Sequence, residues 1–87
     1  MFQVELGPHA AKFLSKLRPQ PRARIEARLK RLRTEPVPSD AKFLGRDERN
    51  NRVFRYRIGD YRALYNIREE AGTIIVIIID KRDHIYD

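Results

Sequence analysis

Residues 54–65 read Phe-Arg-Tyr-Arg-Ile-Gly-Asp-Tyr-Arg-Ala-Leu-Tyr, and this stretch decides the fold. Apolar and polar residues alternate on both sides of Gly59-Asp60, which predicts two strands joined by a two-residue turn. A hairpin closed in this way places Arg57 directly opposite Arg62, with Arg55 on the same face. The other face is largely apolar and carries three tyrosines, which we expect to belong to the core. The hairpin therefore predicts one face for packing and one face that concentrates positive charge.

Two arginines directly opposed on neighbouring strands destabilise a sheet, so the hairpin predicts an anion near Arg57 and Arg62. Asp80 or Asp83 from a neighbouring strand would supply an internal carboxylate. A bound phosphate would serve the same purpose, and the sequence leaves both interpretations open. Because a repulsive contact would be relieved, removal of either arginine is expected to leave thermal stability unchanged or slightly raised.

The chain before the hairpin predicts one strand and two helices. Residues 2–6 alternate between apolar and polar and stop at Gly7-Pro8, where proline suits the first turn of a helix. A second helix follows another pair of prolines and carries Ile25, Leu29 and Leu32 at helical spacing. Two further prolines at 36 and 38 end this helix.

The remaining segments complete a sheet. Residues 42–44 predict a short strand, and residues 73–79 form an apolar run typical of a strand that is covered on both faces. The whole chain predicts an α+β fold in which two N-terminal helices pack on a small antiparallel sheet. The expected order is β-α-α-β-β-β with a possible extra short strand.

Size and composition narrow the range of functions. The 87 residues allow a single domain, 1–87, and contain no cysteine and only two histidines, so we expect neither a metal nor a cofactor. No segment approaches the ~20 apolar residues of a membrane span or the pattern of a signal peptide, so we expect a cytoplasmic protein with no membrane partner. The net charge is +7, and 14 of the 19 basic residues are arginines, whose planar fork matches phosphate. This balance favours a nucleic-acid partner.

Six basic residues gather on the second predicted helix, between positions 22 and 33. They form either an ordinary solvated face or a surface that contacts RNA, with Arg28 and Arg31 as the candidate contacts.

Residues 54–65 resemble the signature hairpin of the RelE/ParE toxin superfamily, and residues 81–86, Lys-Arg-Asp-His-Ile-Tyr, resemble its C-terminal basic-x-x-x-Tyr motif. The first strand, the helix pair and the segment Lys42-Phe43-Leu44-Gly45 extend the resemblance over nearly the whole chain. The resemblance implies the toxin of a type II toxin–antitoxin pair, which in the RelE branch cleaves messenger RNA in the ribosomal A site without a metal. The implied partners are an acidic RelB-like antitoxin, in a higher-order complex, and the ribosome with its mRNA.

The resemblance also implies roles for individual side chains. The implied catalytic residues are Arg57, Arg62, Arg82 and Tyr86. The candidate substrate-binding residues are Arg55 and Lys81, together with Arg28 and Arg31 of the basic helix. Attack of a ribose 2′-hydroxyl on the adjacent phosphate needs charge stabilisation, a base and an acid. Arginine meets the first need but keeps its proton at neutral pH, and the family archetype has lysines where Arg55 and Arg57 stand.

The general base therefore stays open among four C-terminal residues, Lys81, Asp83, His84 and Tyr86. Two alternative functions also stay open: a ParE-like toxin that inhibits DNA gyrase by protein contact, and a catalytically decayed RNA-binding member of the same fold. Retention of the four implied catalytic residues argues against the gyrase branch.

Overall fold

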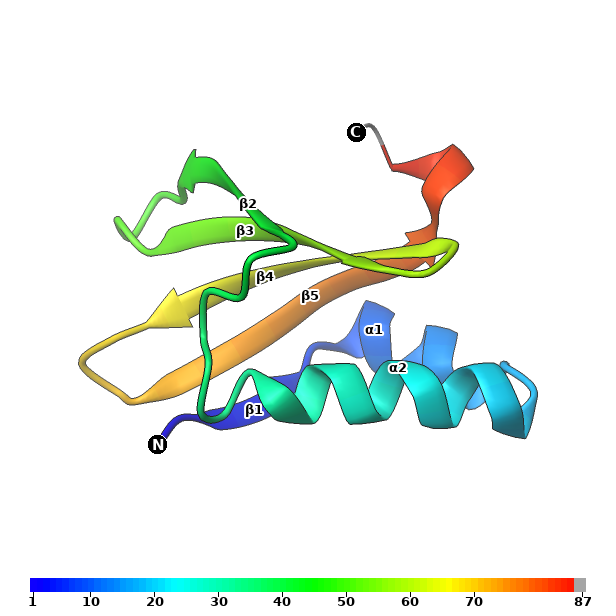
Figure 1. The fold of residues 1–87 in the computed structure, drawn as a ribbon. Coiled ribbons are helices and arrows are strands. Elements are labelled where there is room, and N and C mark those ends of the chain that lie inside the picture. The colour runs from blue at the N-terminus through cyan, green and yellow to red at the C-terminus, as the bar shows by residue number, and fades with distance from the viewer. Residues whose placement is uncertain (86–87) are drawn as a thin grey trace.

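The structure is a computed structural model that describes residues 1–85. It contains five strands, two α-helices and one short 3₁₀-helix (Figure 1). In chain order they are β1 (Gln3–Leu6), α1 (Pro8–Ser15), α2 (Pro19–Arg31), β2 (Ala41–Arg46), β3 (Arg52–Ile58), β4 (Tyr61–Arg68), β5 (Thr73–Lys81) and η1 (Arg82–His84). The expected α+β order is confirmed, and β2 is the possible extra strand.

All five strands belong to one sheet, in the order β1-β5-β4-β3-β2. Neighbouring strands pair antiparallel except β1, which pairs parallel with β5, so the sheet is mixed. Parallel pairing needs a long connection between the two strands, and everything from α1 to β4 provides it. Strand β1 is thus the one departure from a purely antiparallel sheet.

Proline begins both α-helices. Pro8 and Pro19 occupy the first turn, where the missing amide N–H removes no intrahelical hydrogen bond. The apolar positions at helical spacing are buried, as expected: Ala10 and Leu14 on α1, and Ile25 and Leu29 on α2. Within residues 1–85, no helix is long and apolar enough to cross a membrane.

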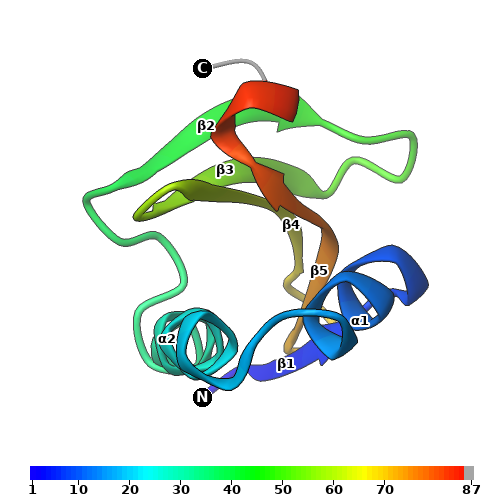
Figure 2. The same cartoon turned by 90° about the vertical axis from the view of Figure 1, so that its right-hand side faces the viewer.

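The core lies between the helices and one face of the sheet, which curves around α2 (Figure 2). Tyr56 and Tyr65 are fully buried in it, so the expectation of core tyrosines is confirmed for these two. Tyr61 is only partly buried and packs against the core from its margin. The Tyr65 hydroxyl donates a hydrogen bond to the Pro36 carbonyl at 2.7 Å. Burial raises the pKa of this phenol, which therefore stays protonated.

The apolar run in β5 is covered well on only one face, so the expectation of a strand buried on both faces is wrong. Ile74, Val76 and Ile79 are fully buried, whereas Ile77 is 36% exposed. The register with β4 shifts at this point, because Leu64 pairs with Ile78 and the next β4 residue pairs with Val76. Ile77 is the extra residue of this bulge, and it has no partner on β4.

Candidate active site

The β3–β4 hairpin brings the predicted arginines together. Gly59 has a φ of +58°, a left-handed conformation that glycine adopts without strain and that the tight turn requires. The register pairs Arg57 with Arg62 and Arg55 with Leu64, as the sequence predicted. Two like charges thus lie directly across from each other beside the turn.

Arg62 is a buried residue, only 3% exposed. Its Nη1 donates two hydrogen bonds of 2.9 Å, to the carbonyls of Gly59 and Tyr61, so the guanidinium clasps the turn of its own hairpin. On the other side, β5 places Asp80 directly opposite Arg62. The register therefore places Asp80, one of the two carboxylates considered for an internal anion, at the strand position next to the arginine pair.

Three of the predicted arginines line one hollow of about 180 Å³. Its lining residues are Ser39, Asp40, Ala41, Lys42, Arg55, Arg57 and Arg62. The side chain of Arg57 is exposed and that of Arg55 half-buried, so both can meet a ligand. We call this the arginine hollow.

The arginine hollow contains a lysine that the sequence analysis did not select. Lys42 lies directly opposite Arg55, because β2 pairs antiparallel with β3. The sequence predicted the strand that contains Lys42 but not the strand with which it pairs. Only the β2–β3 register shows that Lys42 adds its charge to the hollow. An ammonium can give up a proton, which a guanidinium does not do at neutral pH.

Arg82 and Lys81 line a neighbouring hollow of about 420 Å³, together with Asp60, Tyr61 and Asp83. The two hollows adjoin the same hairpin turn, since Arg62 lines one and Tyr61 lines the other. The Arg82 amide donates to the Asp60 carbonyl at 2.9 Å, which fixes η1 against the turn. The remaining predicted catalytic residue, Tyr86, lies outside the described residues.

The short helix η1 also brings His84 to Asp80. The His84 Nδ1 atom lies 2.9 Å from Oδ1 of Asp80, and the Lys81 amide donates to the same oxygen at 2.7 Å. Burial acts to raise the pKa of Asp80, but these two hydrogen bonds and the charges of His84 and His9 lower the pKa below its ordinary value. An ionised carboxylate only accepts hydrogen bonds, so Nδ1 of His84 donates to Asp80, and in the neutral imidazole the lone pair then lies on Nε2.

The two candidates on α2 have different surroundings. Arg28 donates to the Tyr56 hydroxyl at 3.2 Å and to the Arg57 carbonyl at 3.1 Å, and it forms an ion pair with Asp40. Its guanidinium carbon also lies 5.1 Å from the centre of the Tyr56 ring. Arg31 is exposed and forms only a 3.8 Å ion pair with Glu35 among the described residues. Arg28 therefore joins α2 to β3, and Arg31 is the accessible member of the pair.

The cluster can bind and stabilise a phosphate on its arginines and can exchange protons through His84 or Lys42. Among residues 1–85, no group of three or more His, Asp or Glu side chains is placed to hold a metal ion.

Comparison with known proteins identifies the family of the chain. Residues 4–86 match the sequence family of the ParE toxin of the type II toxin–antitoxin system parDE. The curated sequence named as a toxin, RelE1, of Methanocaldococcus jannaschii is 28% identical over 85 residues, which cover 98% of this chain and 94% of that one.

Two crystal structures of toxin–antitoxin complexes are also similar. The archaeal RelE–RelB complex of Pyrococcus horikoshii has a TM-score of 0.82 at 25% identity, over 93% of this chain and 94% of that chain. The complex RelBE2 of Mycobacterium tuberculosis has a TM-score of 0.76 at 32% identity, over 93% of this chain and 98% of that chain. The chain therefore belongs to the ParE toxin family of type II toxin–antitoxin systems, within the RelE/ParE toxin superfamily.

Proposed function

We propose that this toxin is a ribosome-dependent mRNA endonuclease that cleaves in the A site. A ribose 2′-oxygen attacks the adjacent phosphorus, the bond to the 5′-oxygen breaks, and a 2′,3′-cyclic phosphate and a 5′-hydroxyl result. The observation that carries the proposal is the arginine hollow, in which Arg55, Arg57, Arg62 and Lys42 meet. Fixed cationic donors of this kind stabilise the negative charge that develops on the phosphorane.

The arginines differ in the roles that we assign to them. Arg57 is exposed and binds the non-bridging phosphate oxygens, whereas Arg62 is held by the hairpin turn and supplies a fixed positive charge beneath them. Arg82 acts from the neighbouring hollow on the same developing charge. Tyr86 completes the proposed catalytic set, in keeping with the family resemblance.

His84 is the best-supported general base of the four candidates. Its contact with Asp80 orients the imidazole, and Asp80 is the cross-strand partner of Arg62. The Nε2 lone pair then accepts the proton of the 2′-hydroxyl. Lys42 is the group in the arginine hollow that can return a proton to the leaving 5′-oxygen.

Substrate binding is assigned to Arg55 and Lys81 near the hollows and to Arg28 and Arg31 on α2. Support for Arg31 comes from its exposure on the basic helix. Arg28 donates to the Arg57 carbonyl on the hairpin. We therefore expect it to support substrate binding indirectly, by fixing the position of β3. The proposed base is a single exposed histidine, so the chain alone does little to orient the 2′-hydroxyl for attack. We therefore expect naked RNA to be cut slowly and the ribosome to position the message for cleavage.

The partner that restrains the toxin is proposed to be an acidic RelB-like antitoxin, in a higher-order complex. The net charge of +7 supports an acidic partner, and the similar crystal structures contain antitoxins. Both the antitoxin and the ribosome require a cytoplasmic location, which is part of the proposal.

The test is a cell-free translation extract with the purified chain added and the message mapped by primer extension. We expect cleavage at codons held in the A site, and the same concentration of the Arg82→Ala variant should cut far more slowly. The alternative of gyrase inhibition draws support from the ParE family match. Loss of gyrase supercoiling with an intact message would establish that alternative and refute the proposal.

A further inference from the structure

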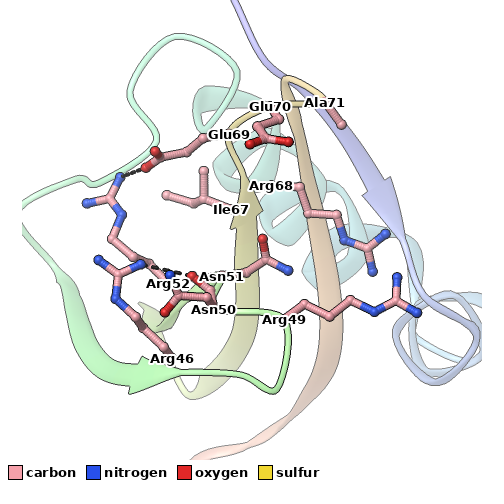
Figure 3. Close-up of a pocket in the computed structure, with 10 residues that line it drawn as sticks. All are labelled: Arg46, Arg49, Asn50, Asn51, Arg52, Ile67, Arg68, Glu69, Glu70 and Ala71. Carbon is pink, nitrogen blue, oxygen red and sulfur yellow. Dashed lines mark hydrogen bonds and ion pairs between the residues drawn. The ribbon is translucent and has the colours of Figure 1, made fainter.

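A second basic hollow lies near the start of β3, whereas the arginine hollow lies toward the end of that strand. Figure 3 shows the residues that line this second hollow. It measures about 430 Å³ and is formed by the loop after β2, the start of β3 and the β4–β5 turn. Four arginines line it, Arg46, Arg49, Arg52 and Arg68, against two carboxylates, Glu69 and Glu70. We call it the distal hollow.

Two of these arginines are already engaged within the chain. Arg52 donates to Glu69 at 2.7 Å, and Arg46 donates to the Asn50 carbonyl at 2.9 Å. Arg49 and Arg68 are exposed, and neither forms an ion pair with any residue of the described part of the chain. Figure 3 shows both side chains extending in the same direction, one from the loop and one from β4. Two cations turned the same way favour an anion between them.

The loop that carries Arg49 is held in one conformation. Asp47 accepts hydrogen bonds from the amides of Arg49 and Asn51 at 3.0 and 2.9 Å. The buried Asn66 of β4 donates to the same carboxylate at 3.1 Å. These bonds and the burial of Asn66 fix the loop before any ligand arrives, so less entropy is lost when an anion binds.

From these observations we infer that the distal hollow is a second phosphate-binding site, which holds the sugar-phosphate backbone of RNA away from the cleaved bond. No lining residue is aromatic, so the site offers no base-stacking platform and should be tolerant of sequence. Arg52 lines the distal hollow and Arg57 lines the arginine hollow, and five residues of β3 place their backbones roughly 17 Å apart. The inference rests on RNA being the ligand of the proposed function, but it does not require cleavage.

The experiment measures binding of a short fluorescein-labelled 2′-O-methyl RNA, which has no 2′-hydroxyl to attack. Fluorescence anisotropy over a series of KCl concentrations gives both the Kd and its salt dependence. We expect the double variant Arg49→Ala/Arg68→Ala to raise the Kd roughly tenfold and to reduce the slope of log Kd against log salt by about 1 to 1.5.

The matched control is Lys12→Ala/Lys16→Ala, which removes the same charge from exposed positions on and beside α1. It should change the Kd by about twofold or less, because it affects only the long-range field. Equal effects of the two double variants would overturn the inference, since net charge alone would then explain binding. The inference also fails if Arg49→Ala/Arg68→Ala weakens antitoxin binding but leaves RNA binding unchanged, because the ligand would then be a protein.

The inference and the proposed function fail separately. RNA bound through Arg49 and Arg68 by a chain that cuts no message would support the distal site and refute the nuclease. Normal A-site cleavage with unchanged RNA binding by the double variant would do the reverse.

Discussion

Nδ1 of His84 lies 2.9 Å from the carboxylate of Asp80, and Asp80 is the cross-strand partner of Arg62. Asp80 therefore contacts the C-terminal turn from a strand position next to the arginine pair of the β3–β4 hairpin. We expect this arrangement to affect both the stability at low pH and the rate of the proposed cleavage, and the two effects can be measured separately.

The first prediction concerns acid stability. Because the pKa of Asp80 in the folded chain lies below its ordinary value of 3.8, ionised Asp80 stabilises the fold. This stabilisation is fully present above the unfolded pKa and is lost as the pH falls through the folded pKa. We expect the Tm difference between the wild type and Asp80→Asn to be largest at about pH 5 to 7 and to shrink toward about pH 2. A difference that stays constant over this range would show that the Asp80 charge contributes nothing.

The second prediction separates the two nitrogen atoms of His84. In His84→Asn, the side-chain amide can still donate to Asp80, but the group that accepts a proton is gone. We expect single-turnover cleavage on programmed ribosomes to fall by roughly 10² with little change in Tm. The matched control, His9→Asn, makes the same change at the chain's other histidine, which is exposed, and should keep a rate near that of the wild type. A wild-type rate for His84→Asn would remove the histidine from the mechanism.

The third prediction compares the two opposed arginines. Arg62 is buried and donates to two carbonyls, so Arg62→Ala should lower the free energy of unfolding by about 1 to 3 kcal/mol. For Arg62 this replaces the expectation of unchanged stability that followed from charge repulsion alone. Arg57 is exposed, and its removal should leave the Tm unchanged or slightly higher. Urea denaturation of both variants measures the difference in their free energies of unfolding. Equal losses of stability in Arg62→Ala and Arg57→Ala would contradict the prediction.

The fourth prediction compares two arginines of α2. Arg28→Ala removes contacts to Tyr56, Asp40 and the Arg57 carbonyl, so we expect a loss of about 1 to 2 kcal/mol in the free energy of unfolding. Arg31→Ala should change stability by about 0.5 kcal/mol or less but weaken ribosome binding, most clearly at low salt. Filter-binding and thermal unfolding measurements on both variants test the contrast. It fails if Arg31→Ala proves the less stable of the two.

The fifth prediction concerns Arg82. Its backbone amide, not its side chain, anchors η1 to Asp60, so Arg82→Ala should keep the fold. We expect cleavage on ribosomes to slow by roughly 10² or more, the scale of losing one fixed donor to a developing oxyanion. Lys16→Ala serves as the control for loss of a single exposed charge. Undiminished cleavage by Arg82→Ala would mean that the hollow beside the turn has no catalytic part.

Local pattern predicted the hairpin because period-2 alternation and the Gly59 turn fix its register without help from the rest of the chain. The two helices were equally clear from their prolines and apolar spacing. Strand β1 was predicted, but its parallel pairing with β5 was not, because nothing local to residues 3–6 specifies a partner so distant in sequence. The bulge at Ile77 was not predicted either, because the apolar run contains no residue that marks an irregularity in the strand.

The site shows the same division between local and distant relationships. The hairpin register predicted that Arg55, Arg57 and Arg62 share a face, and the hollow they line agrees with that. Lys42 could not be placed with them until β2 was paired with β3. The contacts of Arg28 could not be predicted either. Helical periodicity places a side chain on one face of a helix but does not identify the hydroxyl or carboxylate that it contacts.

The parallel pairing of β1 with β5 determines when the toxin can fold during its synthesis. Gln3 has no sheet partner until Thr73 has been synthesised, and β5 also supplies Ile74, Val76 and Ile79 to the core. Closing so long a loop is a late event in folding, because its entropic cost is recovered only when the whole strand packs. The same strand brings Asp80 to its position opposite Arg62, so the packing of β5 completes the core and the part of the candidate site that lies on the sheet. The toxin therefore cannot fold completely until β5 has emerged from the ribosome that synthesises it.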